Sequence, residues 1–323
     1  MARPSINLPV PLKRPTPFEV PEVYVPYTAS GYQPAWSTAT LVDANLVLEG
    51  GAMRGQFTAG VLDFLMDNGV MPKHVIGVSA GALNGFNYVA GSRGRTCYLN
   101  TKYCNDWRYL SMRSFAATGN AFNPDFSFDK IPNELDPFDY DSYRSSPLTL
   151  TTVASDLDLG EADYHQLVDP KREMVYLLAS ASMPLVSKIV EVDNKLLLDG
   201  GICDSIPLGH SQTLGETRHV VVLTQDATYE KGPNRLMPLI RRRYAAYPLF
   251  VERLEHRHFE YNRCYRQLAQ LHEAGEIFVI RPPEPVAIAS MEHDPEKLYN
   301  LWEQGYGEAR RRFSALQRYL GLC

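Results

Sequence analysis

The sequence predicts an α/β fold in which a central, mainly parallel β-sheet is flanked by helices. Across residues 41–281, short apolar runs of strand length alternate with stretches of helical length, which is the pattern of a layered α/β protein. The 323 residues are 45% hydrophobic and 21% charged, a composition that supports a packed core. The polar residues with the clearest chemical pattern follow apolar runs, and α/β sheets place their sites at the carboxyl ends of strands.

The predicted elements divide the chain into three parts. Residues 1–40 are rich in proline and have no steady period, so we expect an N-terminal arm that wraps the core or stays loose. Residues 41–285 form the main domain, and residues 286–323 a C-terminal helical segment that packs on it. The apolar runs predict strands at residues 45–49, 74–78, 148–154, 196–198, 219–223 and 277–280. Helices are predicted at residues 56–68, from residue 80 onward, at 238–271 and at 294–320.

A serine lies between the second apolar run and the helix that follows it. The sequence there is GVSAG, residues 77–81, which matches the G-x-S-x-G pattern of a nucleophile elbow. Such a sharp turn strains the serine backbone and leaves no room for neighbouring side chains, which accounts for Gly77 and Gly81. Ser79 would then lie at a helix N-terminus, where free N–H groups favour negative charge. The pattern alone is equally compatible with an ordinary tight turn.

A glycine-rich turn precedes the helix at residues 56–68. It consists of Gly50, Gly51, Ala52, Met53, Arg54 and Gly55. Backbone N–H groups in such a turn can converge on an anion, but the turn lacks both the G-K-S/T ending of a phosphate loop and the G-x-G-x-x-G pattern. We therefore expect an oxyanion hole. Arg54 either shapes the loop, faces an anionic head group or projects into solvent.

The serine needs a proton acceptor, and the residues leave two kinds of candidate. In a hydrolase triad the acceptor is a histidine that follows an acid, yet none of the histidines after residue 79 lies in a short loop behind a clear strand. Asp199 closes the run at 196–198 and precedes Gly200 and Gly201, so its carboxylate can approach another backbone closely. A dry pocket would raise its pKa above the usual value of about 3.9 and make it a better base. Asp-Gly is also a common turn sequence.

Four sequence blocks, in order, resemble the patatin-like phospholipase family, and its bacterial members in particular. They are the glycine turn at 50–55, the elbow at 77–81, the segment ASASMP at 179–184 and the DGG at 199–201. The strand and turn at 152–161 are similar as well. The resemblance runs from about residue 46 to residue 207 and continues more weakly to residue 281.

This resemblance implies a three-layer patatin-like fold and a catalytic dyad of Ser79 and Asp199 without histidine. It also implies that residues 50–55 form the oxyanion hole and that four glycines support the elbow and the DGG motif, namely Gly77, Gly81, Gly200 and Gly201. The chain departs from the family at Ala52, where a third glycine is common. Alanine keeps the N–H donor but disfavours a positive φ.

The expected activity is that of a lipid acyl hydrolase. Its substrates would be phospholipids, lysophospholipids or related acyl esters, cleaved through an acyl-enzyme with no metal or organic cofactor. Two alternatives remain: an α/β-hydrolase-type carboxylesterase with a histidine base, and a catalytically weak lipid-binding scaffold.

Two further segments bear on the substrate. Residues 100–138 are aromatic and irregular, and we expect either the wall of an apolar acyl pocket or ordinary packing there. Residues 238–271 combine three consecutive arginines with aromatic side chains, so this helix either touches an anionic membrane surface peripherally or presents a solvated face.

Composition excludes several other classes of protein. A net charge of −5 argues against a nucleic-acid partner. There is no apolar stretch of about eighteen residues that could span a bilayer, and the first residues have no apolar secretory core. The five cysteines have neither zinc-site nor disulfide-framework spacing. These features predict a cytoplasmic protein with reduced thiols, possible peripheral membrane contact and no metal; the oligomeric state is not predicted.

Overall fold

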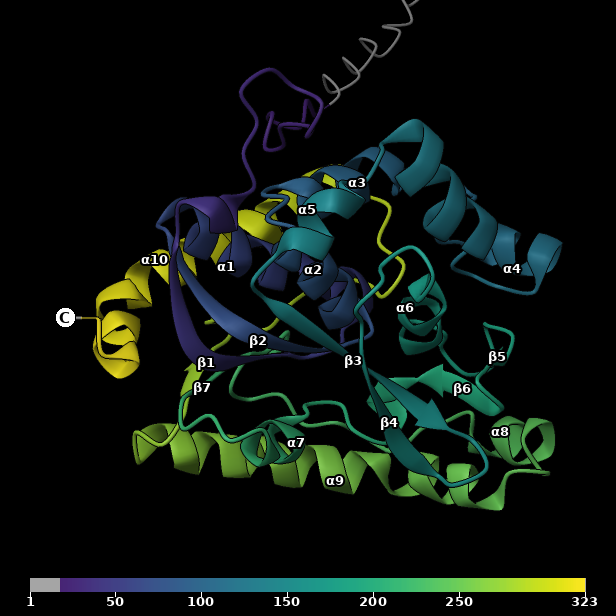
Figure 1. Ribbon diagram of the computed structural model, residues 1–323. Coiled ribbons are helices and arrows are strands. Elements are labelled where there is room, and N and C mark those ends of the chain that lie inside the picture. Colours follow the sequence, from purple (N-terminus) through teal and green to yellow (C-terminus); the bar gives the residue numbers. More distant parts are fainter. Residues whose placement is uncertain (1–17, 323) are drawn as a thin grey trace, which may run out of the picture.

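The computed structural model describes residues 18–322 and is organised around one β-sheet (Figure 1). Within these residues the sheet has eight strands in the order β5-β6-β3-β2-β1-β7-β8, and β4 pairs with β3 off this path. The links among β3, β2, β1, β7 and β8 are parallel, whereas β4, β5 and β6 pair antiparallel. The strands are β1 (Thr40–Leu48), β2 (Val70–Val78), β3 (Thr149–Asp156), β4 (Glu161–Gln166), β5 (Val190–Val192), β6 (Lys195–Asp199), β7 (His219–Val222) and β8 (Phe278–Ile280).

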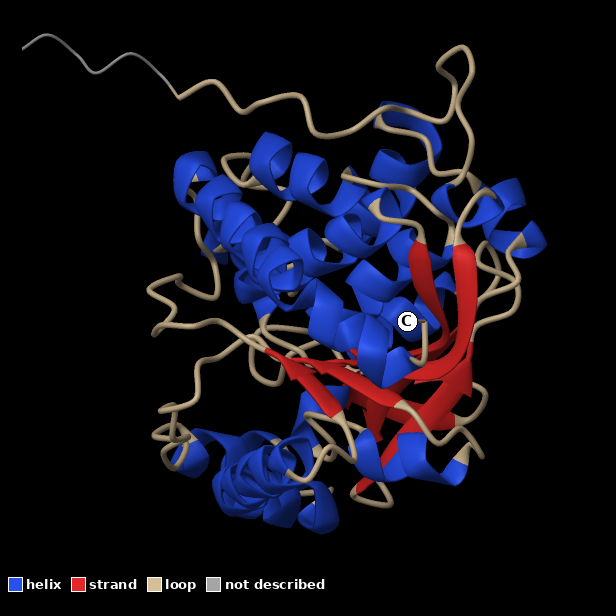
Figure 2. Ribbon diagram, turned by 90° about the vertical axis from the view of Figure 1, so that its left-hand side faces the viewer, coloured by secondary structure: helices blue, strands red, loops and turns tan. Residues whose placement is uncertain are grey.

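Helices cover both faces of this sheet, which Figure 2 shows edge-on. One layer contains α1 (Gly55–Asp67), α2 (Ala80–Val89), α3 (Arg95–Tyr103), α5 (Tyr140–Ser145) and α10 (Pro295–Leu320); the other contains α7 (Leu208–Thr213) and α9 (Pro248–Glu273). Strand side chains alternate between the two faces. Leu46 and Leu48 therefore enter the core beneath α1 and α2, while Val47 packs toward Tyr261 of α9. The predicted α/β fold, with a central sheet between helical layers, is confirmed.

The six strands predicted from apolar runs are all present, with shifted ends. The largest shifts are in β1 and β2, which pair from Thr40 and Val70 onward although the polar residues Asp43 and Lys73 interrupt their apolar pattern. The sequence did not predict β4 or β5. No residue of β4 is buried and β5 has only three residues, so neither produces a strong hydrophobic signal.

Helices are present at each place where the sequence predicted one, but the prediction was wrong for two segments. The predicted C-terminal helix is α10, and Asp294 caps it by accepting from the N–H groups of Glu296 and Lys297. The single helix expected over 238–271 is two, α8 (Met237–Arg243) and α9, because Pro248 starts a new helix. The segment 100–138, which we expected to be irregular, is largely helical. It contains the end of α3, α4 (Met112–Thr118) and a π-helical stretch at Asp125–Leu135.

Both ends of the described chain pack against α1. A Cβ on Gly60 of α1 would lie 2.0 Å from the carbonyl oxygen of Trp302, so this glycine lets α10 cross α1 closely. Val23 of the N-terminal arm is buried beside Cys97 and Trp302. Residues 1–17 of that arm, and Cys323, lie outside the described residues. None of the helices at residues 18–322 combines the length and apolarity that a bilayer crossing requires.

Candidate active site

The turn between β2 and α2 has the geometry of a nucleophile elbow. Ser79 caps α2 and has φ +54° and ψ −120°, a region that non-glycine residues rarely adopt. Its two flanking glycines are required by close contacts: a Cβ would lie 2.6 Å from Ala82 Cα at Gly77 and 2.4 Å from the Leu48 carbonyl oxygen at Gly81. The backbone therefore holds Ser79 at the carboxyl end of the sheet, in the strained position that G-x-S-x-G predicts.

A second serine holds this strained turn in place. The N–H of Ser79 donates to Oγ of Ser180 at 2.8 Å, and the Ser180 hydroxyl donates to the Val153 carbonyl at 2.6 Å. Ser180 is the last residue of α6 (Met174–Ser180) and is fully buried. The ASASMP block thus ties the elbow to β3. The sequence identified this block by resemblance only and indicated no role for Ser180.

Asp199 is the last residue of β6 and is fixed by its own hydrogen bonds. Its Oδ1 accepts from the Gly201 N–H at 2.8 Å, and its backbone N–H donates to the Ser182 carbonyl at 2.8 Å. A Cβ on Gly200 would lie 2.1 Å from the Val153 carbonyl oxygen, so the DGG turn packs directly on β3. This packing explains why glycine follows the aspartate.

The side chains of Ser79 and Asp199 line one cavity. Burial raises the pKa of the Asp199 carboxyl above its ordinary value. Interactions with the Ser79 hydroxyl, the Gly201 N–H and the Arg257 charge offset part of this increase. The two residues therefore share one cavity, in which the buried carboxylate is a stronger base than it would be in water.

The glycine turn lies against the elbow. A Cβ on Gly50 would be 3.1 Å from Ser79 Cβ, and a 3₁₀ turn at Ala52–Arg54 leads from Gly51 into α1. The N–H groups of Arg54 and Gly55 bond to carbonyls within the turn. The turn residues whose amides lack a carbonyl partner among the described backbone hydrogen bonds are thus Gly50, Gly51, Ala52 and Met53. Ala52 has φ +49°, so this chain holds an alanine in the left-handed region where glycine is favoured.

Two cavities of different character meet at Ser79. The first, which we call the apolar cavity, encloses about 1080 Å³ including its open mouth. Residues of the aromatic segment line it, so this segment contributes a wall, although Trp107, Phe115 and Phe126 are not among its lining residues. Its apolar lining includes Met53, Leu83, Phe86, Leu99, Tyr109, Phe122, Phe128, Ile131, Phe138, Leu177 and Met183.

The second cavity, which we call the polar cavity, encloses about 670 Å³ on the same basis. Asp199 and the glycine turn line it, together with charged residues that sequence reasoning did not select, namely Glu49, Lys231 and Arg257. Glu49 is buried and accepts from the Thr224 N–H at 2.6 Å and from the Tyr261 hydroxyl. Burial raises the pKa of this carboxyl as well.

The histidines lie elsewhere. All eight fall within the described residues, and none lines either cavity. His165 stacks on Tyr176 with ring centroids 3.5 Å apart, and His210 stacks on Tyr164 at 3.8 Å. These are packing contacts, so the arrangement offers Ser79 an aspartate and no imidazole.

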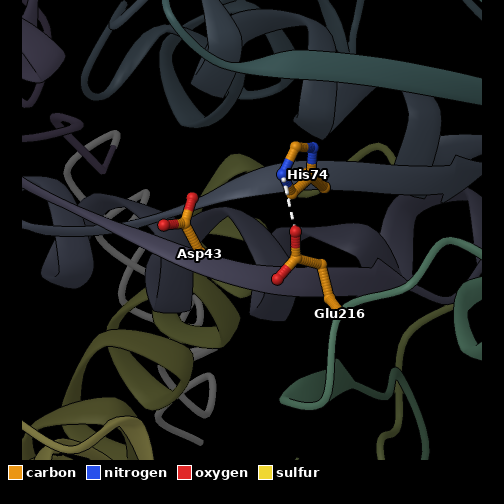
Figure 3. A group of neighbouring side chains, drawn as sticks. All are labelled: Asp43, His74 and Glu216. Carbon is orange, nitrogen blue, oxygen red and sulfur yellow. Dashed lines mark ion pairs between the residues drawn. The ribbon is translucent and has the colours of Figure 1, made fainter.

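A separate group of potential metal ligands comprises Asp43, His74 and Glu216 (Figure 3). His74 Nε2 lies 3.3 Å from Glu216 Oε1, and Asp43 forms an ion pair with Lys73. The group lies beside the middle of β2, and His74 is five residues before Ser79 in the chain. Its side chains already have protein partners, and it is not part of the elbow site.

Comparison with known proteins identifies the family of this chain. The family model described as "Patatin-like phospholipase" matches residues 46–210, just over half of the chain. The chain belongs to the patatin-like phospholipase family. A second model, "Domain of unknown function (DUF6363)", matches residues 247–321, which include α9 and α10.

Two individual proteins are similar to this patatin-like chain. The "Uncharacterized protein YjjU" of Escherichia coli K12 is 26% identical over 261 residues, which cover 75% of this chain and 69% of that protein. The crystal structure of VipD from Legionella pneumophila superposes with a TM-score of 0.40 at 12% identity, covering 84% of this chain and 67% of that one.

Proposed function

We propose that this patatin-like protein is a lipid acyl hydrolase that cleaves carboxylic esters through a Ser79–Asp199 dyad. The observation that supports the dyad most directly is the meeting of a strained serine and a buried carboxylate in one cavity that no histidine lines. The apolar cavity, which opens at the same serine, suits a hydrocarbon chain, and this supports an acyl ester as the substrate.

In the proposed reaction, Ser79 Oγ attacks the ester carbonyl while Asp199 accepts the hydroxyl proton. The oxyanion that forms is stabilised by amides of the glycine turn, where those of Gly50, Gly51, Ala52 and Met53 have no carbonyl partner. Asp199 then gives the proton to the departing alcohol, and an acyl-Ser79 ester remains. Water, deprotonated by Asp199, hydrolyses this ester and restores the free serine. Every proton passes through one carboxylate, and no cofactor takes part in these steps.

The assay for this proposal is release of fatty acid from phospholipids, lysophospholipids and short soluble esters. We expect Ser79→Ala and Asp199→Asn each to lower turnover by at least about a thousandfold, the scale on which loss of a nucleophile or its base acts. A fluorophosphonate should label wild-type protein at Ser79. Wild-type turnover in either variant would refute the dyad. The absence of an adduct at Ser79 would favour the lipid-binding scaffold. Replacement of each histidine in turn tests the carboxylesterase, which a single essential histidine would favour.

We propose in addition that α8 touches the membrane from which such lipids are drawn. Leu236 and Leu239 are more than half exposed beside the arginines at 241–243, which is the composition of an interfacial surface. On sedimentation of anionic vesicles, the wild-type protein should pellet with the vesicles, and the Leu239→Ser variant should stay in the supernatant. Equal retention of the two proteins, or no retention of either, would refute this contact.

A further inference from the structure

A buried carboxylate lies directly before the glycine turn. Glu49 precedes Gly50 in the chain, and 2% of its surface is exposed. Its side chain forms no ion pair with any residue at 18–322. Burial of a carboxylate without an ion-pair partner is costly unless hydrogen bonds compensate for it. The hydrogen-bond donors around Glu49 are therefore essential to the position of this side chain.

Three donors from two segments hold the Glu49 carboxylate. Its Oε2 accepts from the Thr224 N–H at 2.6 Å and from the Thr224 hydroxyl at 3.0 Å. Its Oε1 accepts from the Tyr261 hydroxyl. Thr224 follows β7 and Tyr261 lies on α9, and both are buried. Glu49 thus joins the start of the glycine turn to the long helix beneath the sheet (Figure 1).

The glycine turn needs such support because part of its backbone is strained. Ala52 has φ +49°, a conformation that persists only where the surrounding structure enforces it. The last two amides of the turn bond to carbonyls within it, so these hydrogen bonds fix its end and not its start. At the start, a Cβ on Gly51 would lie 2.7 Å from Thr224 Oγ1. The turn therefore packs directly on the threonine to which Glu49 is bonded.

Tyr261 belongs to a part of the chain that has no assigned role. The patatin-like match ends at residue 210, and Tyr261 falls in the domain of unknown function at 247–321. Neighbours hold its ring on two sides: it stacks on Tyr265 with ring centroids 5.0 Å apart, and Nζ of Lys231 lies 4.2 Å from its centroid. The ring therefore has little freedom to move its hydroxyl away from Glu49.

We propose that α9 of the domain of unknown function completes the active site, with Tyr261 as a positioning residue that acts on the glycine turn through Glu49. This inference rests on the proposed hydrolase function. Amides that stabilise an oxyanion must lie about 2.7–3.1 Å from it, so a small displacement of the turn weakens binding of the transition state. The acyl chain binds in the apolar cavity, whose lining residues do not include Tyr261. Loss of the Tyr261 hydroxyl should therefore lower kcat and leave KM nearly unchanged.

The kinetic test compares Tyr261→Phe with Tyr265→Phe on a short soluble ester. Both variants lose a buried hydroxyl from α9 and keep the aromatic ring, but the Tyr265 hydroxyl donates elsewhere, to the Gln225 carbonyl at 3.0 Å. Tyr261→Phe should lower kcat by about tenfold or more, a part of the hundredfold or greater loss that removal of an oxyanion donor causes. Tyr265→Phe is the matched control and should keep the wild-type kcat.

Two further measurements separate positioning from a general loss of stability. Addition of Ser79 to the carbonyl of a long-chain trifluoromethyl ketone forms an oxyanion, so this inhibitor should bind Tyr261→Phe about tenfold more weakly than wild type. Glu49→Gln provides a second variant for the same assays and should also lower kcat. The double variant should be no slower than the slower single variant, because both substitutions break the same contact.

Hydrogen exchange tests the contact without reference to catalysis. Amides in the peptide that covers residues 50–56 should exchange faster in Tyr261→Phe than in wild type or Tyr265→Phe. An unchanged kcat in Tyr261→Phe, or an equal fall of kcat in Tyr265→Phe, would overturn the positioning role while Ser79-dependent hydrolysis stands. Turnover that survives Ser79→Ala would instead overturn the hydrolase. In that case faster exchange would still support the contact, and unchanged exchange would overturn it.

Discussion

Ser180→Ala tests how the elbow is held. The substitution removes the acceptor of the Ser79 N–H at 2.8 Å and the donor to the Val153 carbonyl at 2.6 Å. Ser180 has no exposed surface, so water cannot readily replace its hydroxyl. Each buried polar group left unsatisfied costs about 1–3 kcal/mol, and we expect the free energy of unfolding to fall by about 2–4 kcal/mol in total.

The same substitution should slow catalysis. Ser79 occupies a backbone region that costs about 1–3 kcal/mol and persists only where neighbouring contacts enforce it. Without the hydrogen bond from its N–H, the turn relaxes and the hydroxyl moves away from Asp199. One to two factors of ten in kcat correspond to about 1.4–2.7 kcal/mol, so we expect a decrease of about tenfold to a hundredfold with little change in KM.

Ser182→Ala is the matched control for this measurement. Ser182 is also buried, but its hydroxyl donates to the Leu178 carbonyl within the same segment, at 2.7 Å, and does not contact the elbow. Urea unfolding and steady-state hydrolysis of a short soluble ester would be measured on both variants. If the two variants lose the same stability and the same kcat, Ser180 does not position Ser79 and the reasoning is wrong.

Two other changes have expected outcomes. Ala52→Gly should raise the free energy of unfolding by about 0.5–1 kcal/mol, because φ +49° strains alanine more than glycine's entropy costs; Ala116→Gly, in the exposed face of α4, should lower it by about 1 kcal/mol in the same urea assay. Asp199→Asn should gain stability over wild type as pH rises. The raised pKa means that the folded protein keeps a proton that the unfolded chain has lost, so the stability of the wild type declines as pH rises from the unfolded to the folded pKa. Urea unfolding of both proteins across this pH range measures the difference, and curves that do not diverge would show the reasoning to be wrong.

The sequence predicted the elbow turn and the DGG turn well because both obey local rules. Ser79 needs glycines on both sides to make its turn, and Asp199 needs them behind it to pack on β3, so the steric requirements are visible in the residues themselves. The core strands were equally visible, because alternate side chains of β1 enter opposite layers. Where the sheet edge is half-exposed, as in β4, no such pattern exists.

The residues that the sequence did not predict are those brought in by tertiary packing. Lys231 lies in an irregular loop and Arg257 on a long charged helix, and neither has a local pattern that separates it from solvated cations. They reach the site because α9 packs under the sheet and Asn262 clamps the loop to it. The helices within residues 100–138 were missed for a similar reason. Phe122 and Phe128 lie along the apolar cavity, so their spacing follows the cavity and not one helical face.

Because the apolar cavity and the polar cavity meet at Ser79, the two products of the reaction leave in a fixed order. Under the proposed mechanism, the acyl group stays tethered with its chain among aromatic rings after the first bond breaks, while the freed alcohol stands on the charged side. Water that approaches the acyl carbon from the polar cavity takes the place of this alcohol, so it reaches the carbon only after the alcohol has left. A small alcohol that enters the polar cavity before water becomes the acceptor of the acyl group, so turnover in glycerol should produce a new ester alongside the fatty acid.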